Sequence, residues 1–171
     1  MPLSLVFASC PPAQVAPLLA ALADHGYERF CPEHLNNPDI RCLPLGLDGT
    51  DAELYEWEIH DLYAALRRAA PQAGFAVVGG ASEEGPGVLR MNHPRLGDFP
   101  ANVPSENHRL SPLFTTPQIT AMLARSANHP DAALRLHVAL GQPWSRQFES
   151  ITPGCLVAAP GWRAATPEDP Q

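Results

Sequence analysis

The chain has 171 residues, a length that fits a single domain able to bury a core of its own. Apolar residues make up 45% of the sequence, which is ordinary for a folded protein and too high for a disordered one. The formal net charge of −7 disfavours binding to nucleic acid and to anionic membranes, and it leaves a basic or neutral partner open. The chain contains 11 arginines and no lysine, which excludes chemistry that needs a lysine side chain, such as a Schiff base.

Cysteine usage and the start of the chain predict a reducing compartment. No apolar stretch near the N-terminus is long enough for a signal-peptide core or a membrane-spanning helix. The cysteines lie far apart, without the dense spacing of a disulfide framework, at positions 10, 31, 42 and 155. We therefore expect a cytoplasmic protein with its cysteines as thiols, made of one domain over residues 1–162 and a flexible tail over 163–171.

The first part of the chain predicts a strand, a helix and a second strand. Residues 3–8 form a short apolar run before two prolines, which is typical of a buried strand followed by the start of a helix. Apolar residues at helical spacing then predict a helix over residues 12–29, with Gly26 near its end. Residues 40–47 indicate a second strand, in which Pro44 favours an edge or a break.

The clearest predicted element is a helix over residues 50–70. Thr50 or Asp51 can cap its start, and Glu53 follows Thr50 at the spacing of a capping box. Acidic residues fill its first half and arginines its end, which complements the helix dipole. The apolar stripe that should face the core consists of Leu54, Tyr55, Ile59, Leu62, Tyr63 and Leu66.

The second half of the chain predicts a hairpin, a long connection and two further helices. Residues 74–80 and 88–92 have the pattern of two strands around a turn-rich segment. Residues 93–117 are rich in proline and have no clear periodicity, which fits a lid or, preferably, a stiff surface wrap. Beyond them we expect two helices, over residues 119–123 and 131–140, and a last strand over residues 151–159.

Taken in order, these elements predict a single-domain α/β sandwich. The order is β-α-β-α-β-β-α, followed by an extra C-terminal helix and strand. This order of elements resembles that of a thioredoxin-like core. The resemblance is an analogy of element order alone, because other α/β sandwiches have the same order.

Cys10 is the first candidate site residue. If the flanking strand and helix are right, its thiol lies at a helix N-terminus, where the dipole lowers the pKa of the thiol and favours nucleophilic or redox chemistry. A dithiol motif would need a second cysteine at position 13, where the sequence has alanine. A buried structural thiol is the alternative, and the sequence favours it.

Cys31, His34 and Cys42 form the second candidate site, because all three side chains can bind zinc. Two residues separate Cys31 from His34, which is the spacing of half a zinc knuckle. A structural zinc site needs a fourth ligand, which only a distant residue such as Cys10 or His25 can supply. We favour the alternative, a loop with a buried cysteine at each end, and expect no bound cofactor.

The helix over residues 50–70 also places an aromatic side chain on its polar side. Trp57 falls opposite the apolar stripe, with Glu53, His60 and Asp61 three or four residues away. An exposed tryptophan among acids is typical of an interface with a hydrophobic centre and an acidic rim. The alternative, that another part of the chain covers Trp57, fits the sequence equally well.

These observations favour a non-enzymatic interaction or regulatory module that docks on a basic protein partner through the helix centred on Trp57. Two alternatives stay open: a thiol-dependent enzyme or redox sensor that uses Cys10, and a zinc-stabilised domain. The sequence identifies neither a substrate nor an oligomeric state.

Overall fold

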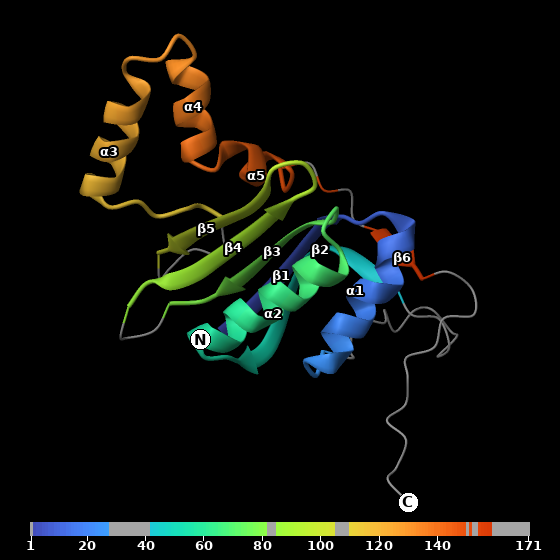
Figure 1. Ribbon diagram of the computed structural model, residues 1–171. Helices are drawn as coiled ribbons and strands as arrows, with labels where there is room; N and C mark the ends of the chain where they lie inside the picture. Colours follow the sequence, from blue (N-terminus) through green and yellow to red (C-terminus); the bar gives the residue numbers. More distant parts are fainter. Residues whose placement is uncertain are drawn as a thin grey trace, which may run out of the picture.

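The computed structural model describes residues 2–27, 42–81, 85–104, 110–149, 151 and 154–158. Within them a single six-stranded antiparallel sheet, in the order β5-β4-β3-β1-β2-β6, forms the centre of the molecule (Figure 1). The elements in chain order are β1 (Pro2–Ser9), α1 (Pro12–Asp24), β2 (Cys42–Glu53), α2 (Glu56–Ala69), β3 (Gly74–Gly79), β4 (Gly87–His93), β5 (Gly97–Val103), α3 (Thr116–Ser126), α4 (Ala132–Ala139), α5 (Gln142–Arg146) and β6 (Gly154–Val157). The predicted α/β class is confirmed.

The path of the chain places β1 in the middle of the sheet. Both β2 and β3 pair antiparallel with β1, so they run parallel to each other on either side of it. α2 connects these two strands across one face of the sheet, as helices commonly do between parallel strands. α1, in contrast, joins the antiparallel neighbours β1 and β2, and it packs beside α2 on the same face (Figure 1).

Alternation along the strands gives the sheet two apolar faces. Leu5 and Phe7 of β1 point to the face that α1 and α2 cover, and they join Phe75 of β3 there. Val6 points to the opposite face, where it packs with Met91 and a second set of apolar residues. Because both faces are covered, the central strands are buried along almost their whole length.

The helical spacing predicted for the two covering helices is confirmed, but the start of α2 was predicted wrongly. Residues 50–53, assigned to a helix cap, extend β2, in which Gly49 pairs with Ser4. α2 begins at Glu56, after Tyr55, whose backbone N–H donates to the Glu58 carboxylate at 2.7 Å. The capping role given to Glu53 is therefore taken by Glu58.

The long connection predicted over residues 93–117 contains a strand. In β5, Phe99, Ala101 and Val103 point to the second apolar face, and the residues between them point away from it. Pro100 is tolerated because β5 is the last strand of the sheet on this side. This part of the connection is therefore neither a lid nor a wrap.

The last helices differ from the first two in how they are held. α3 and α4 form a hairpin beyond β5, away from α1 and α2 (Figure 1). Ser126 is the one residue of α3 that is buried, and no residue of α4 is. α5 anchors the hairpin to the sheet through Trp144, which is buried against Phe99 with ring centroids 5.0 Å apart. The indole N–H of Trp144 donates to the carbonyl of Gly97 at 2.7 Å.

None of the helices in the described ranges has both the length and the apolar character that crossing a bilayer requires. The predicted tail over residues 163–171 lies outside the described residues.

Candidate functional site

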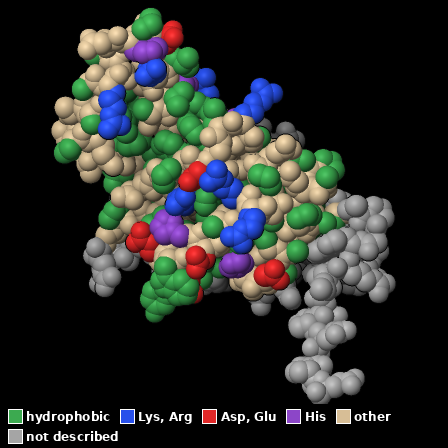
Figure 2. All heavy atoms as spheres, in the orientation of Figure 1, with side chains coloured by type: hydrophobic (Ala, Val, Ile, Leu, Met, Phe, Trp, Pro, Cys, Tyr) green, Lys and Arg blue, Asp and Glu red, His purple; other side chains and the backbone are tan. Residues whose placement is uncertain are grey.

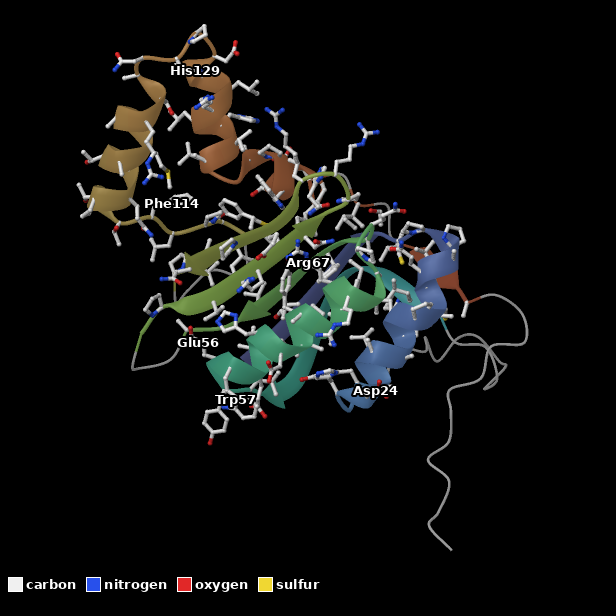
Figure 3. The ribbon with its side chains drawn as sticks, in the orientation of Figure 1. Asp24, Glu56, Trp57, Arg67, Phe114 and His129 are labelled. Atoms are coloured by element: carbon white, nitrogen blue, oxygen red, sulfur yellow. The ribbon has the colours of Figure 1, made fainter. Side chains whose placement is uncertain are left out.

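The most exposed aromatic side chains of the described residues lie at the start of α2. Trp57 is the second residue of the helix, and at 100° per residue it falls opposite the buried stripe that includes Leu62 and Leu66. It is 61% exposed, and Tyr55, just before the helix, is 72% exposed. Figure 3 shows Trp57 at this end of α2, directed away from the sheet. The described residues therefore match the interpretation in which Trp57 is exposed, and none of them covers it.

A shallow hollow of about 250 Å³ lies on the flank of α2 that faces α1. Its wall consists of His25, Tyr27, Leu54, Trp57, Glu58, Asp61 and Leu62. Burial raises the pKa of the Tyr27 phenol, and the negative charge of the nearby Glu58 carboxylate raises it further. We call Tyr55, Trp57, Glu58 and Asp61 the aromatic surface. It joins apolar side chains and negative charge on one side of the helix.

The aromatic surface lies in the most acidic stretch of the chain. Residues 48–61 contain six carboxylates and no arginine, namely Asp48, Asp51, Glu53, Glu56, Glu58 and Asp61. In the space-filling view, acidic side chains lie next to the apolar group that protrudes at the lower edge (Figure 2). Glu53 is the last residue of β2 rather than part of the helix, so its predicted place beside Trp57 on α2 is wrong. Asp61 is exposed on α2, as predicted.

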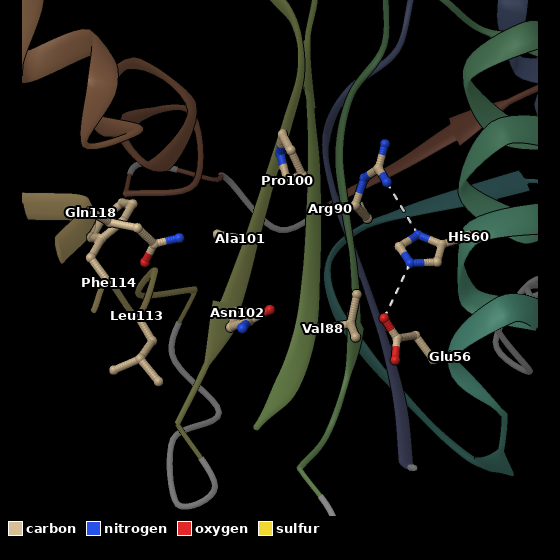
Figure 4. Close-up of a pocket in the computed structure, with 10 residues that line it drawn as sticks. All are labelled: Glu56, His60, Val88, Arg90, Pro100, Ala101, Asn102, Leu113, Phe114 and Gln118. Carbon is tan, nitrogen blue, oxygen red and sulfur yellow. Dashed lines mark hydrogen bonds and ion pairs between the residues drawn. The ribbon is translucent and has the colours of Figure 1, made fainter. Parts of the chain in front are cut away.

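His60, also predicted beside Trp57, turns to the other flank of α2. Its Nδ1 accepts a hydrogen bond from Nη1 of Arg90 at 3.1 Å, and its Nε2 lies 3.5 Å from Glu56 Oε1 (Figure 4). A neutral imidazole has one acceptor and one donor nitrogen, and here both face a partner. His60 therefore lacks a free nitrogen to take a proton from a substrate.

His60 and Arg90 line an open groove of about 220 Å³ between α2, β4, β5 and the start of α3. Its other residues are Glu56, Val88, Pro100, Ala101, Asn102, Leu113, Phe114 and Gln118 (Figure 4). It is a separate site from the aromatic surface, because the two share no lining residue.

Arg90 is the centre of a polar network that joins α2 to the edge of the sheet. It donates to both oxygens of Asp98, from Nε at 3.3 Å and from Nη2 at 2.6 Å, and its guanidinium lies 4.7 Å from the centroid of the Tyr63 ring. Arg67 lies 3.9 Å from the same carboxylate. The Tyr63 hydroxyl donates to the carbonyl of Met91 at 3.2 Å, and burial, and then the nearby Asp98 carboxylate, raise the pKa of this hydroxyl. Because Asp98 neutralises Arg90, the groove offers no uncompensated cation to a phosphate, and we assign the network a structural role.

Cys10 lies where the sequence placed it, directly before α1, but its electrostatics differ from those of an activated thiol. The side chain is buried, and its Sγ donates to the carbonyl of Pro11 at 3.5 Å. Burial raises the pKa of the thiol from 9.0 to about 11. This direction is opposite to the one that a helix dipole would give an exposed cysteine.

The zinc interpretation falls largely outside the described residues, because Cys31 and His34 both do. Cys42 is buried in β2, opposite Val157 of β6. The described part of the chain has no group of three side chains placed to hold a metal ion. The site of Cys31, His34 and Cys42 stays a prediction.

Sequence reasoning missed Tyr55 as a surface residue and assigned it to the buried stripe. The error follows from the helix start, since Tyr55 precedes the first helical residue and does not share the helical repeat. The pairing of Arg90 with Asp98 was also missed, since it depends on β5 lying beside β4.

No family model matches this chain, and no curated protein and no solved structure is significantly similar to it. Function therefore has to be inferred from the chain's own residues.

Proposed function

We propose that this chain is a non-enzymatic interaction module that docks on a positively charged partner protein through the aromatic surface. The observation that carries the proposal is the exposure of Tyr55 and Trp57, two residues apart at the start of a well-packed helix, among carboxylates. Large exposed aromatic side chains are typical of interface centres, where tryptophan and tyrosine contribute most of the binding energy.

The charges around Trp57 define the chemistry of the partner. Glu58 and Asp61 line the same hollow as the indole, and the net charge of the whole chain is also negative. An arginine of the partner can stack on the Trp57 ring, which is worth about 0.5–2 kcal/mol, while the carboxylates attract its charge. The negative potential of the local carboxylates and that of the whole chain both speed the encounter with a basic protein, and they make its rate sensitive to salt.

Three observations favour binding over catalysis. The two hollows described above, which the described residues line, have volumes of about 220 and 250 Å³, and each is smaller than the roughly 300–1,000 Å³ of typical small-molecule sites. Both nitrogens of His60 are engaged, and burial keeps the Cys10 thiol protonated at neutral pH. None of these groups has the freedom that a general base or a nucleophile needs.

The test is a calorimetric titration with a synthetic amphipathic peptide that carries leucine and arginine. We expect saturable binding that weakens at high salt and that falls at least tenfold in Trp57→Ala, because a central interface tryptophan contributes about 2 kcal/mol or more. Leu96→Ala is the matched control, since Leu96 is also exposed but lies in the β4–β5 turn.

A second peptide, with glutamate in place of arginine, tests the sign of the charge. Equal affinity for the two peptides, or equal affinity of Trp57→Ala and the wild type, would overturn the proposal. Circular dichroism of each variant confirms that the change is in binding and not in folding.

A further inference from the structure

The α3–α4 hairpin carries a second exposed apolar surface. Ile119 and Leu123 of α3, and Leu134 and Val138 of α4, are all exposed, although each is a large aliphatic side chain. Within each helix the two residues are four positions apart, so they lie on the same side, one turn above the other. We call Leu134 and Val138, which lie on one side of α4, the aliphatic surface.

The pattern of α4 shows that this exposure does not result from an ordinary amphipathic helix. Its half-buried apolar residues, Ala132, Leu136 and Ala139, lie on one side. At 100° per residue, Leu134 and Val138 lie on the opposite side, which an amphipathic surface helix would keep polar. A helix with apolar residues on two sides is typical of one that is covered on both.

The hairpin also differs from the aromatic surface in charge. Residues 116–149 contain three arginines and two carboxylates, whereas residues 48–61 contain six carboxylates and no arginine. Arg125 and Arg135 are exposed on the two helices of the hairpin. One chain thus presents the aliphatic surface, with the exposed Arg135 beside it on α4, and an aromatic surface with exposed carboxylates.

Within one molecule the two surfaces lie on helices that do not pack against each other. α2 packs on the face of the sheet that contains Leu5 and Phe7, whereas α5, which anchors the hairpin, packs on the opposite face. A contact between the surfaces therefore has to form between copies, and each copy has one of each to offer.

We propose that copies of this chain associate head to tail, the aliphatic surface of one copy docking on the aromatic surface of the next. This association rests on the proposed function, and it identifies a second copy of the chain as the partner of the aromatic surface. Arg135 meets Glu58 and Asp61, and Leu134 and Val138 cover Tyr55 and Trp57. Pairing of two hairpins through Leu134 and Val138 would instead bring Arg135 of both copies together, with Asp131 as the one carboxylate between residues 116 and 139.

The experiment uses two variants that each block one surface, Trp57→Ala and Leu134→Asp. Both side chains are 61% exposed, so neither change should unfold the protein, which thermal denaturation monitored by circular dichroism verifies. Sedimentation velocity at rising concentration is expected to show association of the wild type that weakens with salt, and at least tenfold weaker association of each variant alone. An equimolar mixture of the two is expected to form a heterodimer, because each supplies the surface that the other lacks.

The mixture separates this arrangement from the symmetric ones. If Trp57→Ala associates like the wild type while Leu134→Asp does not, hairpins pair with hairpins and the inference is overturned. The reverse result means that aromatic surfaces pair, and it overturns the inference as well, as does an equimolar mixture that stays monomeric. A wild type that remains monomeric but binds the arginine peptide through Trp57 removes the inference and leaves the proposed function standing.

Discussion

The helices that cover the sheet, α1 and α2, and those of the α3–α4 hairpin all have apolar side chains at helical spacing, but they reach different degrees of burial. α1 and α2 each bury four apolar side chains, whereas α3 buries only Ser126 and α4 buries none. The difference lies in the neighbours: α1 and α2 pack on each other and on a sheet, but the hairpin has little besides its own two helices and α5. An apolar stripe shows that a surface needs a cover, and it does not show whether that cover belongs to the same chain.

The largest expected effect is in the body of the protein, at Phe75. This ring is fully buried in β3, with its centroid 5.6 Å from that of Tyr63 and 6.2 Å from that of Phe7. We expect Phe75→Ala to lower the free energy of unfolding by about 3–5 kcal/mol, the cost of removing a buried aromatic side chain. Urea unfolding followed by circular dichroism measures it, with exposed Leu96→Ala as the control. A loss below about 1 kcal/mol would mean that this core is not tightly packed.

The next effect tests the junction between the body and the hairpin, at Gly141. Its φ of +71° is unfavourable for other residues, and an added Cβ would overlap the buried ring of Phe99. We expect Gly141→Ala to cost about 2–3 kcal/mol, from the left-handed backbone and the crowding together. Chemical denaturation measures it, and Gly85→Ala, where a Cβ meets nothing within 4 Å, is the control. Equal stability of the two variants would show that the hairpin is not held through this junction.

Cys10 provides a pH-dependent test of burial in the body. Because burial raises the pKa of the folded-state thiol from 9.0 to about 11, ionisation favours the unfolded chain. The contribution of Cys10 to stability is full below pH 9 and is lost as pH rises from 9 to about 11. Unfolding experiments across this range should therefore give a steeper decline for the wild type than for Cys10→Ala. Parallel curves would show that this thiol is not shielded from water.

The parts of the fold that could be predicted are those in which a local pattern and the burial agree. The spacing of Val15, Leu18 and Leu22 predicted α1, and the turn between two apolar runs predicted the β3–β4 hairpin. Residues 50–53 could not be placed in β2 from the sequence, because their pairing with β1 is a contact between distant segments. β5 was not predicted, because Pro100 interrupts the alternation of Phe99, Ala101 and Val103 in a stretch rich in proline.

In the candidate site, too, the features set by local helical geometry were predictable from the sequence, and those set by contacts with distant residues were not. The exposure of Trp57 follows from helical geometry alone, and the structure has it on the expected side. The direction of His60 does not, because it depends on Arg90, 30 residues further along the chain. For the same reason no local pattern could separate the aromatic surface from the groove.

The smallest expected effect is in the hairpin, and it depends on protein concentration. Leu134 is exposed, so in dilute protein Leu134→Ala should change the free energy of unfolding by less than about 0.5 kcal/mol. If the hairpin docks on a second copy, concentrated wild-type protein gains stability by mass action and the variant gains less. The difference between them should then grow with concentration, which thermal unfolding at several concentrations measures. A loss of 2 kcal/mol or more in dilute protein would instead place Leu134 in a core of its own chain, and the contrast between the body and the hairpin would disappear.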